Sequence, residues 1–391
     1  MNKLFLWGIE NSTRNESQGL SGEENKNLEP VPKKFLDVIL RSDASKMKTL
    51  VDIFTSDTTT FEEKIVALEE LEFLLQIIDN ANDLHHPTVD GLVPLLKGVK
   101  GELNPDPEYR MRCCWALATA LQNNPKVQAQ VMELGGVQTF LESLHNELSI
   151  NTTSNNDQQA NSMHLQLLSK IIFCLSALLT HNKEAQKQFW KSGGFQTLNT
   201  LLTSISSHLT SISQEELKVI PTPLAEDNLI TPDEEVTRTD TGGIIFNIVD
   251  IEDKVKDKAQ QLKKIREENP QVESPVVVWL RLARRTIFML NNLLLESEEL
   301  KLVVVKENNG ALLRTLLNVL ESQEDMELKE TVIRLLDTLT SNSTKQMQGY
   351  IIDLVKKMPL KEVLVRQNSL SEVKDHEELM SLISQIVVKL A

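Results

Sequence analysis

Few residues of this chain have the types and spacing that metal binding requires. The three cysteines are Cys113, Cys114 and Cys174, and no two of them have the spacing of a zinc site or a disulfide framework. His85 and His86 are adjacent, with no pattern of carboxylates beside them that would complete a metal site. The sequence therefore predicts no metal and no cofactor, and the sparse, unpaired cysteines favour a reducing, cytoplasmic compartment.

Motifs of catalysis are missing from the sequence as well. It contains no G-x-x-x-x-G-K-[ST] loop to bind phosphate and no G-x-S-x-G turn to present a nucleophilic serine. Gly242 and Gly243 are adjacent, but two glycines alone do not make a phosphate loop. We therefore predict no catalytic residues and no enzymatic activity. An active site assembled from residues distant in the sequence is the alternative.

The composition favours helices and a protein partner. The chain has 391 residues, of which 40% are hydrophobic but only 4% aromatic, and its formal net charge is -15. Scarce aromatic residues make strands less favoured than helices. Binding to nucleic acid requires clustered Lys and Arg, which an acidic chain lacks. No apolar run approaches the length needed to cross a bilayer. We therefore expect no nucleic acid and no membrane among the partners.

The elements that must position any site are repeated along the chain. The segment "WALATALQNNPKVQAQVMELGGVQTFLESL", from Trp115, aligns with "FCLSALLTHNKEAQKQFWKSGGFQTLNTLL", from Phe173, at apolar residues, at an Asn and at a pair of glycines. Further matches begin at Phe73 and Phe288, with a fainter one at Leu339. Once insertions are allowed, the repeat is about 42 residues, within the range of armadillo and HEAT units. Such units must stack on one another to bury their apolar faces.

Each repeat is predicted to contain three helices. In the clearest copy these cover residues 108–123, 126–134 and 137–148, with Pro125 beginning the second and the Gly135 and Gly136 pair ending it. Three helices with a tight glycine turn between the last two indicate an armadillo unit. We therefore predict an all-α fold, a right-handed superhelical solenoid of armadillo repeats.

Polar segments divide the predicted solenoid. A polar and proline-containing stretch separates residues 1–32, expected to be a flexible N-terminal segment, from a helical repeat domain over residues 33–391. Inserts interrupt the repeats at about 149–163 and 203–274. The second insert contains the charged helical run "KVKDKAQQLKKIREENP", and we expect this insert to project from the solenoid as a mobile loop.

A basic ladder recurs at one position of the long helices. Arg112, Lys170 and Arg285 occupy equivalent sites, whereas the first and last repeats have Glu70 and Glu330 there. The long helix of an armadillo unit lines the concave side, so this ladder is a candidate for pairing with carboxylates of a partner. The alternative is that long basic side chains merely cover the helix face.

Two other ladders have structural interpretations that we favour. Asn82, Asn124, Asn182 and Asn342 lie near the ends of long helices, where Asn tolerates the left-handed conformation, so capping is preferred to partner contact. The aromatic ladder is predicted to be core, with Trp115 alone a candidate for the concave rim because its indole N–H needs a partner. Its members are Phe73, Trp115, Phe173 and Phe288.

Several segments resemble a known family. They are "ALEELEFLLQIIDNANDL" (67–84), "RMRCCWALATALQNNPKVQ" (110–128) and "LARRTIFMLNNLL" (282–294), behind the N-terminal "LFLWGIENS". Together these resemble the armadillo-type nucleotide exchange factors of heat-shock-protein-70 (DnaK-like) chaperones, most of all the cytosolic fungal branch. The resemblance is weaker in the long polar insert and in the C-terminal region.

This resemblance implies a mechanism. Such factors hold the ATPase domain of the chaperone in the concave face of the solenoid and distort one lobe, so that ADP leaves, ATP enters and the client is released. The partner expected from the resemblance is thus a cytosolic heat-shock-protein-70 chaperone, through its ATPase domain and also its client-binding domain. A general armadillo scaffold that binds an extended peptide is the alternative function.

The apolar N-terminal segment has a role in the same resemblance. In the family, a flexible N-terminal segment occupies the client site of the chaperone. The residues with that character here are Leu4, Phe5, Leu6, Trp7 and Ile9. We hypothesise that they mimic a client, and tethering would raise their effective concentration once the solenoid is bound. The alternative is that they pack on the solenoid as an amphipathic first helix.

Overall fold

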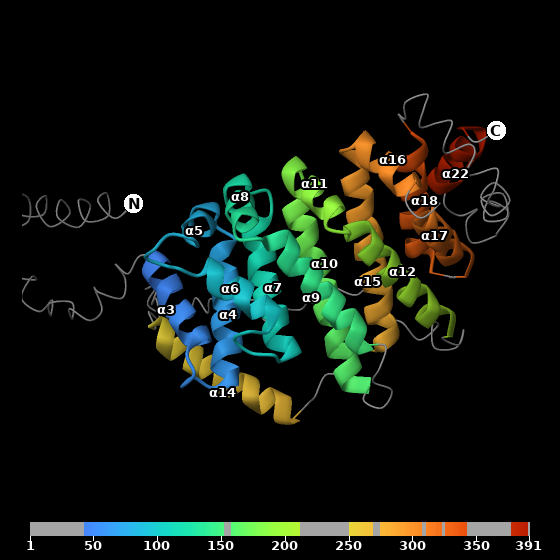
Figure 1. Cartoon of the computed structure of the whole chain (residues 1–391). Helices are drawn as coiled ribbons and strands as arrows, with labels where there is room; N and C mark the ends of the chain where they lie inside the picture. Colours follow the sequence, from blue (N-terminus) through green and yellow to red (C-terminus); the bar gives the residue numbers. More distant parts are fainter. Residues whose placement is uncertain are drawn as a thin grey trace, which may run out of the picture.

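The computed structural model describes most of the predicted repeat domain (Figure 1). Every regular element in the described part of the chain is an α-helix, which confirms the predicted all-α repeat fold. The helices stack side by side into an elongated array, as expected of a solenoid. The described residues are 43–151, 158–211, 250–268, 274–306, 310–322, 325–341 and 377–389.

Two layers of helices make up the stack. The long-helix layer, in which each helix packs on the next, consists of α4 (Phe61–Leu75), α7 (Pro107–Leu121), α10 (Gln158–Leu179), α15 (Pro275–Leu295) and α18 (Met326–Thr340). The second layer packs against it and consists of α6 (Leu92–Lys100), α9 (Gly136–Asn151), α12 (Gly194–Ser211) and α17 (Ala311–Ser322). Leu, Ile and Val side chains from both layers form one continuous core.

Short helices join the two layers along one edge of the stack, at the top of Figure 1. They are α5 (Ile78–Asp83), α8 (Pro125–Glu133), α11 (Lys183–Lys191) and α16 (Glu298–Lys306). Three further helices lie outside this pattern: α3 (Asp43–Thr55) packs on α4, α14 (Ile251–Glu268) packs on α3 and α4, and α22 (Glu377–Lys389) packs on α18.

The two glycines predicted to end a short helix are each required for a different physical reason. Gly135 has φ of 75°, in the left-handed region that L side chains rarely adopt. A Cβ on Gly136 would lie 2.2 Å from Cγ1 of Val131 and 2.9 Å from its carbonyl oxygen, so no side chain fits there. The pair therefore fixes the tight turn from α8 into α9 that the armadillo pattern requires.

The predicted helix bounds and insert bounds need small corrections. The three helices predicted from residue 108 onward begin one residue earlier than expected, and α9 continues to Asn151. Helix α10 begins at Gln158 and α12 reaches Ser211, so both repeats extend into the stretches predicted as inserts. Apolar residues that continue the helical period, such as Ile205 and Leu209, are buried and extend the packing. The prediction that the second insert projects from the solenoid is wrong for α14, which packs on α3 and α4.

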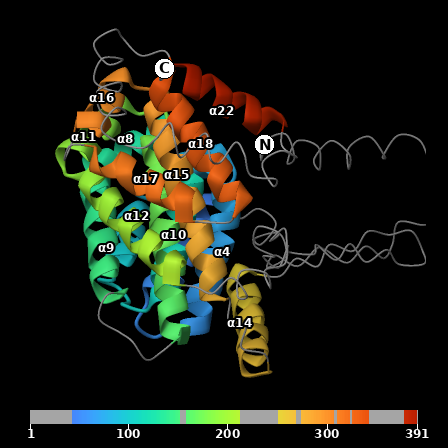
Figure 2. The same cartoon turned by 90° about the vertical axis from the view of Figure 1, so that its right-hand side faces the viewer.

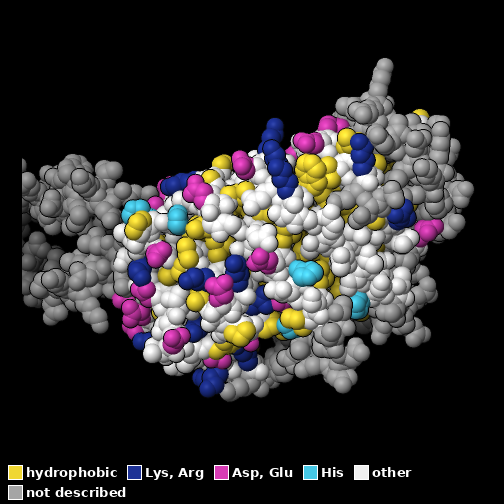
Figure 3. Space-filling model, in the orientation of Figure 1, with side chains coloured by type: hydrophobic (Ala, Val, Ile, Leu, Met, Phe, Trp, Pro, Cys, Tyr) yellow, Lys and Arg dark blue, Asp and Glu magenta, His cyan; other side chains and the backbone are white. Residues whose placement is uncertain are grey.

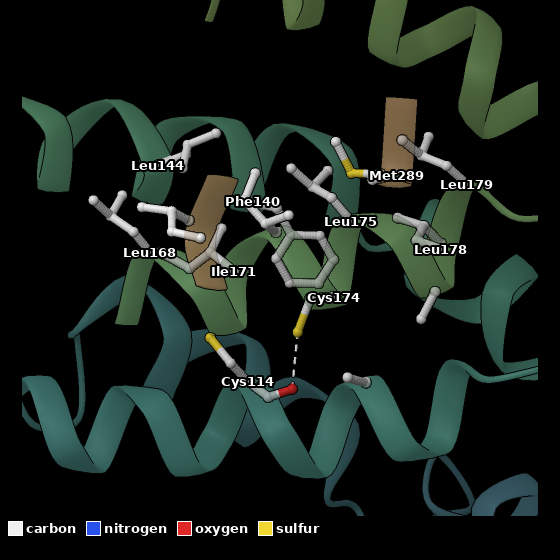
Figure 4. Close-up of a cluster of buried hydrophobic side chains, with 14 of the residues drawn as sticks. Cys114, Phe140, Leu144, Leu168, Ile171, Cys174, Leu175, Leu178, Leu179 and Met289 are labelled. Carbon is white, nitrogen blue, oxygen red and sulfur yellow. Dashed lines mark hydrogen bonds between the residues drawn. The ribbon is translucent and has the colours of Figure 1, made fainter. Parts of the chain in front are cut away.

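The core joins α7 and α10 closely enough for a thiol to bond across the two helices. Cys174 points from α10 toward α7, and its Sγ donates to the carbonyl oxygen of Cys114 at 2.8 Å (Figure 4). Apolar side chains such as Phe140 and Leu178 surround this contact. Burial raises the pKa of the Cys174 thiol well above its usual value, so the thiol stays protonated. All three cysteines are buried and free.

Helix α10 contains an unusually apolar stretch. Residues 162–179 are long and apolar enough to span a membrane by length and composition, with mean hydropathy 1.5, so the prediction that no run has this property is wrong. In the structure 72% of this stretch is buried. Helices α7, α9 and α15 cover it, as neighbours cover the core helix of a helical repeat.

One buried ion pair ties the two layers together. Arg110 on α7 pairs with Glu147 on α9, which is fully buried, and the Arg110 Nε donates to the carbonyl oxygen of Val99 at 3.0 Å. His164 Nδ1 on α10 lies 2.6 Å from the second carboxylate oxygen of Glu147. Burial acts to raise the pKa of Glu147, but the hydrogen bond from His164 and the charge of Arg110 outweigh it and hold that pKa below its ordinary 4.5.

Replacing Glu147 is expected to destabilise the solenoid strongly. Glu147→Gln leaves the cation of Arg110 buried without its anion, which should lower the free energy of unfolding by about 3 to 5 kcal/mol at neutral pH. Because the folded pKa is lowered, this stabilisation is present above the ordinary value of 4.5 and is lost as the pH falls through the folded pKa. The difference between wild type and variant should therefore shrink in acid, as measured by urea unfolding. Glu142→Gln, exposed on the same helix, is the control and should change stability little.

Candidate partner-binding face

The long helices expose one side that the second layer does not cover. We call this the long-helix face: the side of α4, α7, α10, α15 and α18 that points away from α9 and α12 in Figure 2. Partly exposed residues recur on it, in α7 and α15 at spacings of three and four along the chain, because the remaining sides of each helix pack on neighbours. On α7 the stripe is Glu108, Arg112, Trp115 and Thr119, and the exposed Gln122 follows directly after the helix.

The predicted basic ladder lies along this face, with Arg112 and Arg285 partly exposed and Lys170 only 7% exposed, and each member reaches onto the preceding long helix. Arg112 Nη2 lies 2.9 Å from Glu69 Oε1 on α4. Lys170 Nζ lies 3.1 Å from the ring centroid of Trp115 on α7. These contacts place the ladder across the joints between repeats.

Arg285 on α15 completes the ladder. Its Nη1 donates to Ser169 Oγ at 3.0 Å, and its guanidinium lies 5.9 Å from the centroid of the Phe173 ring. A cation over an aromatic face is attracted by the electrons of the ring. The sequence predicted the basic positions but not these partners on the preceding helix. These partners could have been found from the sequence, because an acidic or aromatic residue lies on the same stripe of the previous repeat.

The prediction that the aromatic ladder is core is wrong for two of its members. Phe73 and Phe288 are 49% and 57% exposed, and both lie on the long-helix face. Phe173 and Trp115 are partly exposed beneath the cations of the next helix. Each aromatic residue follows the basic-ladder position of its helix by three residues. The aromatic ladder therefore shares the outer, partly exposed side of the helix and does not belong to the buried side. All four aromatics are therefore at least partly exposed on the outer stripe of their helices.

Two members of the Asn ladder cap helices, although by another geometry than predicted. Asn124 and Asn182 begin α8 and α11, and their side-chain oxygens accept hydrogen bonds from the backbone N–H of Val127 at 3.3 Å and of Ala185 at 3.1 Å. Both are therefore N-caps of the following short helix. Their amide oxygens are engaged at the edge of the stack.

The left-handed backbone conformation predicted for the Asn ladder is adopted instead by the residue that precedes each of the two capping Asn residues. Asn123 and His181 have φ of 50° and 56° and turn the chain from the long helix into the short one. Asn82 instead lies inside α5, and its Oδ1 is a buried atom without a hydrogen-bond partner among the described residues. Asn342 lies outside the described residues.

Charge changes sign along the long-helix face. The acidic end gathers Glu62, Glu69, Glu70, Glu72 and Glu108 on α4 and the start of α7. The middle is basic, from Arg112 to Arg285. Burial raises the pKa of Glu108, with Arg266 and Arg112 opposing the shift. The opposite broad side of the molecule, which carries α9 and α12, shows acidic and basic side chains intermixed (Figure 3).

Polar contacts also link neighbouring long helices on this face. Thr119 on α7 donates to Glu72 Oε1 at 2.8 Å, and Thr338 on α18 donates to Asn291 Oδ1 at 2.6 Å. Such contacts hold the stripes of adjacent repeats in register. The long-helix face is therefore held together by contacts between neighbouring repeats. Within the described residues no group of three or more His, Cys, Asp or Glu is placed to hold a metal ion.

Family models match the part of the chain that carries the first three long helices of this face, α4, α7 and α10. The model described as "Nucleotide exchange factor Fes1" matches residues 1–84, and the model described as "SIL1/FES1/HPBP1 C-terminal domain" matches residues 89–220. Together they account for more than half of the chain. The chain belongs to the Fes1/SIL1 family of nucleotide exchange factors. This family is non-catalytic, in agreement with the prediction that the chain is not an enzyme.

Individual relatives come from both branches of the family. Nucleotide exchange factor SIL1 of Mus musculus is 31% identical over 187 residues, which is 47% of this chain and 36% of the relative. The Hsp70 nucleotide exchange factor FES1 of Mycosarcoma maydis is 25% identical over 51% of this chain and 49% of its own length. FES1 of Coccidioides immitis is 30% identical over 36% of this chain and 66% of its own. The chain thus spans about a third to a half of the first two relatives.

Two solved structures align with a larger share of this chain than the relatives do. Two engineered proteins determined by the Northeast Structural Genomics Consortium align with TM-scores of 0.46 and 0.49, at 14% and 13% identity. The alignments cover 90% and 88% of this chain and 97% and 98% of theirs.

The contact between Lys170 and Trp115 should be measurable as a coupling between repeats. A double-mutant cycle with Lys170→Met and Trp115→Leu is expected to give an interaction free energy of about 0.5 to 2 kcal/mol in urea unfolding, because the cation is buried over the ring. The control cycle pairs Trp115→Leu with Lys187→Met, an exposed Lys on α11, and should be additive. Additivity in both cycles would contradict a contribution of the cation to the joint between α7 and α10.

Proposed function

We propose that this chain is a nucleotide exchange factor for a heat-shock-protein-70 chaperone and binds the ATPase domain of that chaperone with its long-helix face. The observation that carries the proposal is the overlap between the family match and the structure. Residues 1–84 and 89–220 match the exchange-factor family, and within them α4, α7 and α10 provide the first three stripes of the long-helix face. The related fungal proteins are named Hsp70 nucleotide exchange factors.

The proposed mechanism needs differential binding and no covalent chemistry. A rigid stack that fits the open, nucleotide-poor form of the ATPase domain better than the closed form shifts the equilibrium toward the open form. ADP then leaves, ATP enters, and ATP drives release of the client. The continuous packing of α4, α7, α10 and α15 supplies the rigidity, because each stripe is held by its neighbours.

The contacts of this face suit a partner that carries carboxylates. Arg112, Lys170 and Arg285 lie in one row, and each is already oriented by a side chain of the preceding helix. Preoriented cations lose less conformational entropy on binding than free ones. The half-exposed Phe73 and Phe288 add apolar surface at the two ends of the row. We propose these five residues, with Trp115, as the core of the binding surface.

The N-terminal segment is proposed to act on the other end of the chaperone. Residues 1–32, including Leu4 to Ile9, lie outside the described residues. They keep the role of a tethered client mimic in this proposal, ahead of a helical repeat domain from residue 33. Tethering to a bound solenoid raises the effective concentration of the segment at the client site.

The compartment is part of the proposal. We propose a cytosolic protein, supported by the three buried free thiols, of which Cys174 is engaged as a hydrogen-bond donor. A fluorescent fusion at the C-terminus in a fungal cell should distribute through the cytosol. Retention in the endoplasmic reticulum would instead assign the chain to the compartment of the SIL1 branch.

Charge reversal on the basic ladder is expected to weaken exchange. Wild-type protein should accelerate release of a fluorescent ADP analogue from a cytosolic heat-shock-protein-70 chaperone. Arg112→Glu combined with Arg285→Glu should lower the affinity at least ten-fold, because each reversal replaces an attraction to a carboxylate by a repulsion. The measurement is the release rate as a function of factor concentration.

A matched double variant controls for the change in net charge. Lys187→Glu combined with Arg314→Glu reverses two exposed charges on α11 and α17, away from the long-helix face, and should retain wild-type exchange. Acceleration by neither wild type nor control would overturn the exchange-factor proposal and favour a general armadillo scaffold. Equal activity of all three proteins would show that the basic ladder only covers the helix face.

Deletion of residues 1–32 should separate the two proposed activities. Acceleration of ADP release is expected to persist, because the solenoid alone carries it, whereas release of a bound fluorescent client peptide should become slower. A full-length variant with Leu4, Phe5, Leu6, Trp7 and Ile9 replaced by Ser should behave as the deletion does. Unchanged client release in both variants would rule out the client mimic.

A further inference from the structure

Helix α14 is the one described helix that lies wholly within the long polar insert, and it lies against the first repeats (Figure 2). It packs on α4 and α3, although it is separated from them by most of the solenoid in sequence. It belongs to neither layer and repeats no element of the armadillo unit. Its position therefore requires its own explanation.

Ion pairs hold α14 on the acidic end of the long-helix face. Lys254 Nζ and Lys258 Nζ lie 2.8 Å and 2.6 Å from the two carboxylate oxygens of Glu70. Arg266 lies 2.5 Å from Glu108 on α7 and 3.6 Å from Glu62 on α4. One row of cations on α14 thus faces one cluster of carboxylates contributed by two adjacent long helices.

The position of Glu70 places α14 on the proposed partner face. In the repeat alignment Glu70 is the counterpart of Arg112, Lys170 and Arg285. Its side chain is only 8% exposed because the two lysines cover it. Phe73, one turn further along α4, stays 49% exposed. Helix α14 therefore covers the start of the stripes on α4 and leaves the aromatic ladder open.

The interface of α14 has the character of a reversible contact. Val255 and Ala259 are its buried apolar residues, and Ile251 and Leu262 are partly buried. The side chains of Lys254, Lys258 and Arg266 remain 31% to 36% exposed, so water and salt screen their ion pairs. Two small buried anchors and screened ion pairs distinguish this contact from the continuous core that joins the two layers.

We propose that α14 is a displaceable competitor built into the chain: it occupies the acidic end of the long-helix face, and the chaperone must displace it to use that part of the face. This inference rests on the proposed function. An internal competitor reduces the apparent affinity by the fraction of molecules in which it is docked. If about nine-tenths of the molecules have α14 docked, the partner binds about ten-fold more weakly than it would otherwise.

Charge reversal on α14 tests the competition. Lys254→Glu with Lys258→Glu places like charges against Glu70 and should release the helix. The matched control, Lys256→Glu with Lys263→Glu, makes the same charge change on exposed positions of the same helix. In a third protein, Glu70→Lys is added to the first pair to restore attraction. Circular dichroism checks folding, hydrogen exchange of the amides of 251–268 reports docking, and titration with a heat-shock-protein-70 chaperone reports affinity.

The expected result is a coupled change in docking and affinity. The first variant should show faster amide exchange in α14 and up to about ten-fold tighter chaperone binding, while the control matches wild type in both. The charge swap should restore slow exchange in α14. Released α14 with unchanged or weaker chaperone binding would overturn the competition, and so would amide exchange that the reversal leaves unaltered.

The two proposals fail in different ways. Binding of the chaperone by wild type and the released variant with equal affinity overturns the competition alone and leaves the exchange factor intact. Absence of chaperone binding in both forms, at low ionic strength as well as at physiological ionic strength, overturns the proposed function and the competition together.

Discussion

Each long helix of this protein depends on the next one for burial of its apolar sides. A single repeat is too small to bury its own leucines, so α7 needs α4 and α10, and α10 needs α7 and α15. Leu117 and Leu175 hold the same place in successive repeats, and both are fully buried. Stability is therefore a property of joints between repeats, and the outer stripe of each helix is left free to differ.

The cations on the outer stripe serve the joints as well as the face. Lys170 covers Trp115 and Arg285 covers Phe173, so the residues proposed to meet a partner also fasten one repeat to the previous one. A partner that draws a cation away from its ring changes the joint beneath it. In this way binding and stacking share the same side chains, which couples contact on the face to the geometry of neighbouring repeats.

Periodicity predicted much of this fold but not the side on which each ladder lies. The recurrence of the segment from Trp115 at Phe173 was enough to predict the helices, the turn at Gly135 and the row of basic residues. It did not distinguish an inner from an outer stripe, so Phe73 and Phe288 were assigned to the core although they are exposed. The docking of Lys254 on Glu70 joins residues 184 positions apart, a contact that no local pattern contains. Placement of that kind depends on charges that meet only after the repeats have stacked.

The sequence separation of α14 from its docking surface also sets an order of assembly during synthesis. At ribosomal speeds of about 5 to 20 residues per second, the 184 positions between Glu70 and Lys254 take roughly 10 to 40 s to translate. The first three long helices emerge and pack in that interval, because their contacts are local. A nascent chain therefore displays its acidic end uncovered until residues 251–268 have also been synthesised and can dock.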